Sequence, residues 1–161
     1  PSLVFGPGDR GNLLSLIRNI KEGKYKHIGG AETSKSVIHS TDLAKAINLC
    51  LNNLPDGVQV FNVANPDPVS VKLLTESIAK CLNMSGKIAS VPEGVFRIGA
   101  KVAQIFMQEK SPITIDQVNK LTTNTTISTA RLVGATGFAP DMALEKAIEE
   151  EIQWASAANL L

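Results

Sequence analysis

The sequence predicts an α/β fold in which the edge of a strand sheet is joined to a smaller, mostly helical lobe. Short apolar stretches with strand character alternate with amphipathic helices in the first part of the chain, and helices dominate afterwards. The chain has 161 residues, of which 43% are hydrophobic and 19% are charged. This composition is typical of a globular unit with a packed core and argues against intrinsic disorder.

Strands and one helix are expected at the start of the chain. Residues 2–5 form an apolar run that predicts a buried strand at the sheet edge. Residues 12–21 carry apolar side chains at helical spacing, and Gly23 is expected to end this helix. Short strands are expected at 26–28 and at 36–39.

A second helix and a second sheet-edge strand follow. Residues 40–42 start the helix, where we expect the Asp42 carboxylate to cap the first free backbone amides. Its buried stripe is expected to consist of apolar residues at helical spacing, namely Leu43, Ala46, Ile47, Cys50 and Leu51. Residues 58–63 are expected to form the second strand of the sheet edge.

The rest of the chain is expected to be mostly helical. Ser70 is expected to cap a helix, with Val69 and Leu74 packed together as a hydrophobic staple. The further expected elements are a strand at 88–91, a helix at 95–107, a helix opened by a capping box at Thr114 and Gln117, a short helix capped by Ser128 and ending at Gly134, and a final helix at 142–157.

Charge and composition exclude several classes of function. The net charge is +1 and 4% of residues are aromatic, so neither a basic field nor stacking platforms indicate nucleic-acid binding. No apolar run in the sequence approaches the roughly 18 residues of a membrane-spanning helix, and no His/Cys cluster has metal-ligand spacing. Cys50 and Cys81 lie on apolar helical faces, where reduced thiols are the default, so we expect a cytoplasmic protein.

Gly6, Gly8 and Gly11 have the spacing of the G-x-G-x-x-G dinucleotide fingerprint. Pro7 stands inside the turn, where it donates no backbone amide, and Asp9 would bring negative charge toward the phosphates. The acidic ribose ligand expected about 20 residues further on is missing from the sequence. We therefore interpret this stretch as a turn that does not bind a dinucleotide.

Four ordered segments carry a family resemblance. They are PSLVFGPGD at 1–9, VIHSTDLA at 37–44, VFNVAN with PVS between 60 and 70, and RLVG to GFAP at 131–140 with the helix at 147–154. In this order and spacing, they resemble the C-terminal half of the extended short-chain dehydrogenase/reductase family, which is the NAD-dependent epimerase/dehydratase group. The pattern is most similar to nucleotide-sugar epimerases and reductases.

The resemblance implies a Rossmann-type fold of which residues 1–161 are the C-terminal, substrate-binding portion. The chain begins inside an apolar strand, which fits such a piece, and the N-terminal dinucleotide-binding domain is then absent. By the same resemblance, the parent protein uses NAD or NADP for hydride transfer at a secondary alcohol of a nucleotide-sugar, and it forms a homodimer.

The catalytic Tyr-x-x-x-Lys motif of the family lies upstream of this half. Tyr25 is the only tyrosine of the chain, and Gly29 stands four residues on, where the lysine would be needed. We therefore expect no catalytic residue in this chain and no activity for this polypeptide alone.

The resemblance also implies which residues contact the ligands. Pro1, Ser2 and Leu3 match the strand beneath the nicotinamide and the reacting sugar, although a plain core strand would explain them as well. The residues implied for the nucleotide and diphosphate of the substrate are Asn12, Leu13, Ile28 and Lys35, where Lys35 replaces an arginine found in many epimerases. Arg10 is a further candidate for the substrate, because its guanidinium group could pair with phosphate.

Structural roles are the alternatives for several of these polar residues. Asn12 could be an ordinary helix cap, and Arg10 could be a solvated loop charge. We expect His39 to be structural because no acid partner is evident for it. His27 is expected to be exposed.

Two other functions fit the same segments. A hydroxysteroid-dehydrogenase-like reductase of a hydrophobic alcohol would share the scaffold, and a pocket without phosphate-binding cations would favour it. A non-catalytic binding module could also reuse the fold, since fold alone does not establish function.

Overall fold

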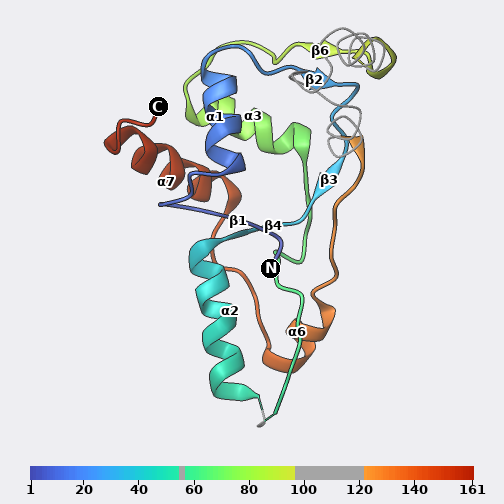
Figure 1. Cartoon of the computed structure of the whole chain (residues 1–161), viewed down its shortest axis with the longest axis vertical. Helices are drawn as coiled ribbons and strands as arrows, with labels where there is room; N and C mark the ends of the chain where they lie inside the picture. Colours follow the sequence, from blue (N-terminus) through green and yellow to red (C-terminus); the bar gives the residue numbers. More distant parts are fainter. Residues whose placement is uncertain (55–56, 97–121) are drawn as a thin grey trace, which may run out of the picture.

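The computed structural model of the chain describes residues 1–54, 57–96 and 122–161. Its elements in chain order are β1 (Leu3–Phe5), α1 (Asn12–Lys21), β2 (His27–Ile28), β3 (Ser34–Lys35), β4 (Val37–His39), α2 (Ser40–Asn53), β5 (Val69–Ser70), α3 (Val71–Cys81), β6 (Ser90–Val91), α6 (Ala130–Thr136) and α7 (Leu144–Ala157). Helices α1, α3 and α7 gather at one end of an elongated molecule and α2 and α6 at the other, with β1 and β4 between them (Figure 1). The predicted α/β, mostly helical architecture is confirmed.

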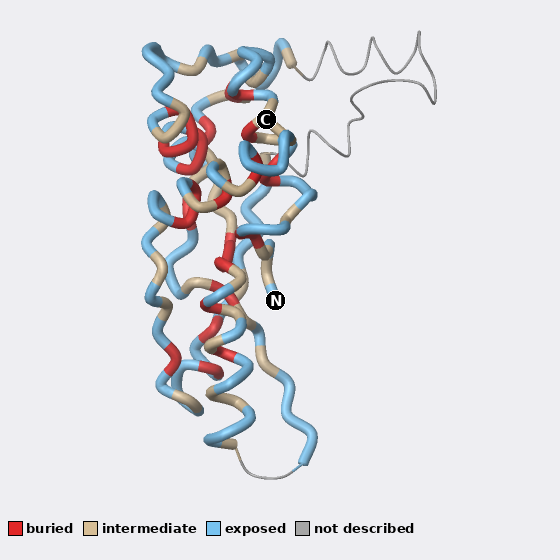
Figure 2. The backbone as a smooth tube through the Cα atoms, turned by 90° about the vertical axis from the view of Figure 1, so that its left-hand side faces the viewer, coloured by how far each residue is buried: buried red, intermediate tan, exposed pale blue. Residues whose placement is uncertain are grey.

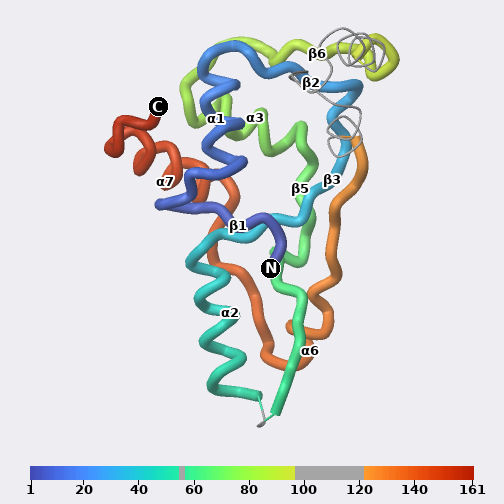
Figure 3. Tube along the Cα trace, viewed as in Figure 1, coloured from blue at the N-terminus to red at the C-terminus, as the bar shows by residue number. Residues whose placement is uncertain are grey.

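The strands form three separate pairs among the described residues. Strands β1 and β4 are parallel, with Leu3 opposite Val37. Strands β2 and β6 are also parallel, with His27 opposite Ser90, and β3 pairs with β5 in the antiparallel sense. The tube in Figure 3 shows how these pairs bring together segments that are far apart in the sequence.

The larger hydrophobic core lies among α1, α3 and α7, which pack against one another. Figure 2 shows these buried segments inside the wider end of the molecule. The buried members of this core are Phe5, Leu13, Ile17, Ile20, Val37, Val69, Leu74, Ile78, Ala79, Ala147 and Ile148. Burying a side chain of this kind stabilises a fold by about 1.5–3 kcal/mol, so this cluster is the main source of stability.

Helix α1 has the bounds that the sequence predicts. Leu13, Leu14, Ile17 and Ile20 are all buried, because their spacing places them on one face. Gly23 has a φ of 67° just beyond the helix, a conformation that glycine adopts without the cost that a Cβ would bring.

Helix α3 begins as predicted. The Ser70 side chain accepts a hydrogen bond from the backbone amide of Leu73 at 3.1 Å. Val69 and Leu74 are both buried in the larger core, as the staple requires. The cap and the staple together fix the point at which the chain enters α3.

His39, not Asp42, caps α2. The Nδ1 atom of His39 accepts from the backbone amide of Thr41 at 3.4 Å, and the residue is 2% exposed, so its expected structural role is confirmed. The buried Asp42 carboxylate accepts instead from the backbone amides of Asp141 and Met142, at 2.9 and 3.3 Å. The prediction that Asp42 caps its own helix is wrong, because its side chain ties α2 to the segment before α7.

A smaller hydrophobic core lies between α2 and α6. Its buried members are Ile38, Ala46, Leu132 and Phe138, and Leu43 and Cys50 pack against them. The predicted stripe of α2 is partly wrong, since Ile47 and Leu51 are 51% and 78% exposed.

Residues 58–63 do not form the predicted sheet-edge strand. Among the described residues, their backbone bonds only at the end of the segment, where the Ser2 amide donates to the Val63 carbonyl at 2.9 Å. The side chains still alternate as in a strand, because Val58 and Val60 are exposed whereas Phe61 and Val63 pack against the smaller core. A strand needs a partner along its length, and the described chain does not supply one here.

The last helices deviate slightly from their predicted bounds. The N-cap of α6 is Thr129 rather than Ser128, and the helix runs past Gly134 to a left-handed Gly137. Helix α7 begins at Leu144 rather than at residue 142. The predicted helix at 95–107 lies mostly outside the described residues, and the predicted capping box at 114–117 lies wholly outside them.

None of the helices in the described part of the chain combines the length and the apolar character needed to cross a bilayer.

Replacing Asp42 by alanine is expected to lower the free energy of unfolding by about 1–3 kcal/mol, because two partly buried amides lose their acceptor. Asp141→Ala is the matched control, since Asp141 pairs with Lys45 at 2.6 Å but its side chain is 76% exposed. Asp141→Ala should lower the free energy of unfolding by less than about 1 kcal/mol. Urea unfolding of both variants measures the difference, and equal losses would contradict the role assigned to Asp42.

Candidate functional site

A partly open cavity of about 380 Å³ lies between the β2–β6 pair and the facing ends of α1 and α3. Its volume falls within the range of small-molecule sites. The lining is formed by six apolar or aromatic residues, Tyr25, Ile28, Ala31, Val71, Val91 and Phe96, and by four polar ones, Asn19, Lys24, Lys26 and Thr33.

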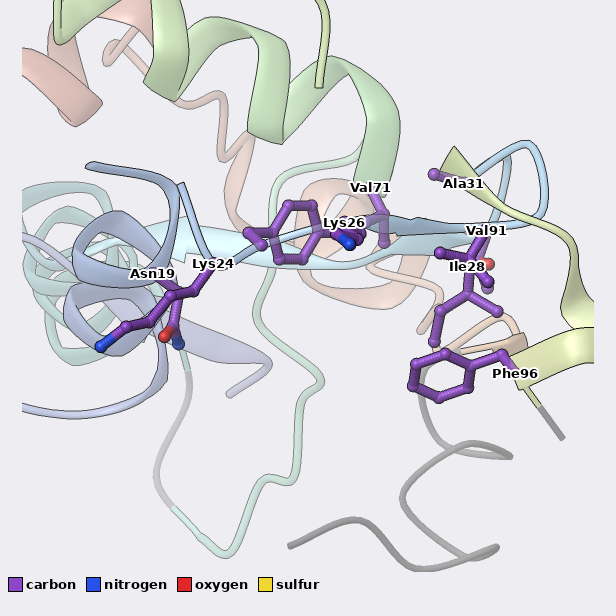
Figure 4. A pocket seen from close by; sticks show the side chains of 10 residues that line it. Asn19, Lys24, Lys26, Ile28, Ala31, Val71, Val91 and Phe96 are labelled. Carbon is purple, nitrogen blue, oxygen red and sulfur yellow. The ribbon is translucent and has the colours of Figure 1, made fainter. Parts of the chain in front are cut away.

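The lining of the cavity has two distinct ends. Ile28, Val91 and Phe96 lie near one another at one end, and Asn19 and Lys24 lie at the other (Figure 4). The cavity can therefore offer an apolar surface to one part of a ligand and a positive charge to another.

His27 supports the wall of the cavity from the buried side of β2. Its Nε2 lies 2.8 Å from the Thr75 hydroxyl oxygen, and that hydroxyl lies 2.9 Å from the Val71 carbonyl. Because the hydroxyl donates to the carbonyl, the imidazole donates to the hydroxyl oxygen. His27 is 6% exposed and burial lowers its pKa, so the expectation that His27 is exposed is wrong.

Ile28 is the one residue implied for the substrate that lines the cavity. Lys35 lies on β3, where its Nζ donates to the Thr123 carbonyl at 2.7 Å and to the Thr125 hydroxyl at 3.1 Å. Burial lowers the pKa of Lys35. Its ammonium group holds residues 123–125 against β3, and a diphosphate would have to compete with these acceptors.

The other implied substrate residues lie at the start of α1. Arg10 and Asn12 are exposed, whereas the Leu13 side chain is buried in the larger core and could offer a ligand only its backbone amide. No side chain caps the helix, but the Asp9 carboxylate accepts from the Gly11 amide at 2.7 Å. This carboxylate occupies a position suited to a phosphate, which agrees with rejecting the dinucleotide fingerprint.

The residues implied for the cofactor lie at the start of β1. Pro1 is exposed, Leu3 is 36% exposed, and Ser2 is half-buried. The hydroxyl oxygen of Ser2 and the amide oxygen of Asn65 are buried, and neither has a hydrogen-bond partner among the described residues. Buried polar atoms of this kind are uncommon unless a ligand or a water molecule satisfies them.

Most of the cavity lining was not predicted from the sequence. Tyr25, Val91 and Phe96 were not selected, because the parallel pairing of residues 27–28 with 90–91 joins segments about sixty positions apart. The available signal was the position of apolar residues next to Gly29 and Pro92, at the ends of two short strands.

No group of three or more metal-ligating side chains comes together within residues 1–54, 57–96 and 122–161.

Sequence relatives of the chain are sugar epimerases, although no family model matches it. It is 22% identical over 157 residues to N-acetyl-alpha-D-glucosaminyl-diphospho-ditrans,octacis-undecaprenol 4-epimerase of Escherichia coli O157:H7, covering 96% of this chain and 47% of that protein. It is 24% identical over 160 residues to UDP-glucose 4-epimerase of Vibrio cholerae, covering 99% of this chain and 46% of that protein. The chain thus spans about half the length of these curated relatives.

Solved structures show the same fold. UDP-glucuronic acid 4-epimerase from Bacillus cereus, in complex with NAD, superposes with a TM-score of 0.66 at 13% identity, over 97% of this chain and 43% of that one. Structural neighbours include a complex with NADPH as well as complexes with NAD. The resemblance to the NAD-dependent epimerase/dehydratase group of the extended short-chain dehydrogenases/reductases is confirmed.

Gly6 is where the loop before α1 makes its closest approach to the end of β4. A Cβ at Gly6 would lie 2.5 Å from the Ser40 hydroxyl oxygen and 2.7 Å from His39 Nε2, and the φ of Gly6 is 138°. We expect Gly6→Ala to lower the free energy of unfolding by about 2 kcal/mol or more.

Gly8→Ala is the matched control for this change, because Gly8 has a φ of 104° but no atom within 4 Å of an added Cβ. The difference between the two variants in thermal unfolding therefore isolates the steric clash from the backbone strain. Equal destabilisation by both substitutions would show that the close approach is not needed.

Proposed function

Because the chain has the fold and the relatives of the extended short-chain dehydrogenases/reductases, we propose that it is the substrate-binding portion of an NAD(P)-dependent nucleotide-sugar epimerase, dehydratase or reductase. The cavity beside β2 and β6 would hold the nucleotide of the substrate. The observation that carries this proposal is the composition of the cavity lining, which is apolar at one end and contains two lysines elsewhere.

The apolar end of the cavity suits a nucleobase. Phe96 offers an aromatic ring, and Ile28 and Val91 add aliphatic surface beside it. Flat aromatic ligands gain from such contacts through burial and ring stacking. Ile28 is also the residue that the family resemblance implies for this part of the substrate.

Lys24 and Lys26 bring positive charge to the same cavity. Lysine ammonium groups attract phosphate as point charges. Lys24 also pairs with Glu22 at 2.6 Å, but both side chains are half or more exposed, and exposed pairs of this kind are weak. The two lysines favour a nucleotide-sugar over the hydrophobic alcohol of a hydroxysteroid-dehydrogenase-like reductase.

The start of β1 has side chains that suit a position beside the cofactor. The Ser2 hydroxyl, which has no hydrogen-bond partner in the part of the chain that the structure describes, and the partly exposed Leu3 side chain would border the nicotinamide. When bound, NAD or NADP would supply hydride transfer at a secondary alcohol. The chain's own contribution would be to hold the substrate's nucleotide and exclude water around it.

Tyr25 is unsuited to proton transfer. Burial raises the pKa of its phenol, whereas an acid–base phenol needs a lowered pKa near the working pH. Its ring packs edge-on against His27, with centroids 5.6 Å apart. This environment supports a binding role for the chain, with the reactive phenol and its lysine elsewhere in the parent protein.

Strongly exposed apolar side chains support a larger parent protein. Val58 is 96% exposed, Leu51 78% and Val60 71%. A covering domain in the parent protein would account for the exposure of these side chains. In the proposed parent, the dinucleotide-binding domain would cover residues 58–60 and supply the backbone partners that residues 58–62 lack among the described residues.

UDP-glucose is expected to bind the chain at millimolar concentration or below, as followed by amide chemical shifts in an NMR titration. Phe96→Ala should weaken both uridine and UDP-glucose binding by about tenfold, since base–aromatic stacking is worth about 1–3 kcal/mol. Lys26→Glu should weaken only UDP-glucose, because uridine carries no phosphate. Lys146→Glu, at an exposed lysine of α7, is the control and should change neither.

The absence of UDP-glucose binding at millimolar concentration would contradict the proposal. Saturable binding of a steroid alcohol instead would support the hydroxysteroid-dehydrogenase-like alternative.

The 161-residue chain alone is expected to show no NAD(P)H turnover with UDP-glucose, because it lacks the Tyr-x-x-x-Lys pair. Nicotinamide absorbance over hours with concentrated protein is the measurement. Turnover that Tyr25→Phe abolishes would overturn this prediction and make Tyr25 the proton donor.

A further inference from the structure

Ala31 has a backbone conformation that alanine rarely adopts. Its φ is 52°, in the left-handed region where a Cβ is unfavourable. Within the described residues, the other non-glycine residues with positive φ are Asn83 and Asn159. Both asparagines follow a helix and donate their amides back to its last turn, at 3.0 and 3.1 Å, which is a common way for a helix to end. Ala31 lies between two strands, so helix termination does not explain its conformation.

Hydrogen bonds on both sides hold Ala31 in this conformation. Its amide donates to the Ile28 carbonyl at 3.3 Å, and its carbonyl accepts from the Lys72 amide at 2.9 Å. Two positions further along, the Thr33 carbonyl accepts from the Val71 amide at 2.8 Å. The segment that contains Ala31 is therefore tied both to β2 and to the start of α3, so its position is fixed.

The hydrophobic cores do not account for the methyl group of Ala31. The residue is 6% exposed, but it belongs to neither the larger nor the smaller core of the described chain. It lines the cavity beside β2 and β6 instead. Glycine would adopt the same conformation without strain, and backbone strain of this kind clusters at functional sites. The strain at Ala31 thus coincides with the candidate functional site.

Ala31 lies at the apolar end of the cavity, together with Ile28, Val91 and Phe96 (Figure 4). Ile28 and Val91 stand opposite each other in the parallel pair, and the Gly29 amide donates to the Val91 carbonyl at 2.8 Å. Backbone bonds therefore fix the width of this end. The methyl group is all that the side chain of Ala31 can add to it.

We propose that Ala31 is a specificity-determining residue, whose methyl group restricts the apolar end of the cavity to a single-ring pyrimidine base. This inference rests on the proposed nucleotide site. The cavity volume of about 380 Å³ is near the lower limit for small-molecule sites, and a purine needs room for a second fused ring. Because the wall at Ala31 is tied on both sides, it cannot retreat to provide that room. The substrate is accordingly a pyrimidine nucleoside diphosphate sugar.

Replacing Ala31 by glycine should relax this restriction. UDP and ADP carry the same diphosphate, so the ratio of their dissociation constants reports on the base. Ala31→Gly should weaken UDP binding by about threefold to fourfold, the loss expected for one buried methyl group, and it should strengthen ADP binding. The preference for UDP over ADP should fall by about tenfold, because relief of a steric clash adds to the lost contact. Amide chemical shifts in NMR titrations of the full chain measure both constants.

Ala44→Gly is the matched control, because Ala44 is exposed on α2 and does not line the cavity. The change to glycine within a helix should lower the thermal unfolding temperature and leave both dissociation constants unchanged. Ala31→Gly, by contrast, should not lower the unfolding temperature, because glycine removes the backbone strain. A fall as large as that of Ala44→Gly would show that the methyl group serves packing, and it would overturn the proposal.

The binding measurements separate this inference from the proposed function. Equal affinity of the unaltered chain for UDP and ADP would overturn the inference and leave the nucleotide site standing. An unchanged preference for UDP in Ala31→Gly would have the same consequence. If the unaltered chain bound neither nucleotide, the proposed function itself would be contradicted, and the role of Ala31 with it.

Discussion

The parallel pairing of β1 with β4 is the constraint on which the described structure depends. Its register places Val4 opposite Ile38 and Phe5 opposite His39. Because side chains alternate across a strand, Phe5 and Val37 enter the larger core while Val4 and Ile38 face the smaller one. The two-stranded ribbon is thus the common wall of both cores. A slip of one residue would exchange the two sets of side chains and leave neither core filled.

The carboxyl ends of the same two strands fix the positions of the segments that follow them. Strand β1 ends at Gly6, whose missing side chain leaves room for His39 at the end of β4. His39 in turn starts α2, and Asp42 in the first turn of that helix holds the entry to α7. One compact junction therefore sets the positions of the Gly6–Gly11 loop, of α2 and of α7. This explains why it contains a glycine, a buried imidazole and a buried carboxylate rather than apolar residues alone.

The sequence was sufficient to predict those elements whose structure depends on residues close together in the chain. Helices α1 and α3 could be predicted because their apolar spacing, the Ser70 cap and Gly23 all lie within the elements they define. Asp42 shows the limit of this reasoning, since the amides it accepts from are about one hundred residues away. The cavity was missed for the same reason, because its lining comes from segments that are far apart in the chain.

The proposed binding site and the proposed cofactor edge differ in whether their polar groups have hydrogen-bond partners within the chain. Around the cavity, β2 bonds to the β6 segment through the amides of His27 and Gly29, so this wall is complete within the described chain. Residues 58–62 have the opposite character, since they alternate as in a strand but have no backbone partner in the described chain. The buried Ser2 hydroxyl likewise has no hydrogen-bond partner there. A site whose walls have all their backbone partners can bind a ligand without another domain. A surface with unpaired polar groups needs a further domain or a ligand to supply the missing hydrogen bonds. The proposed nucleotide site has the first property and the proposed cofactor edge has the second.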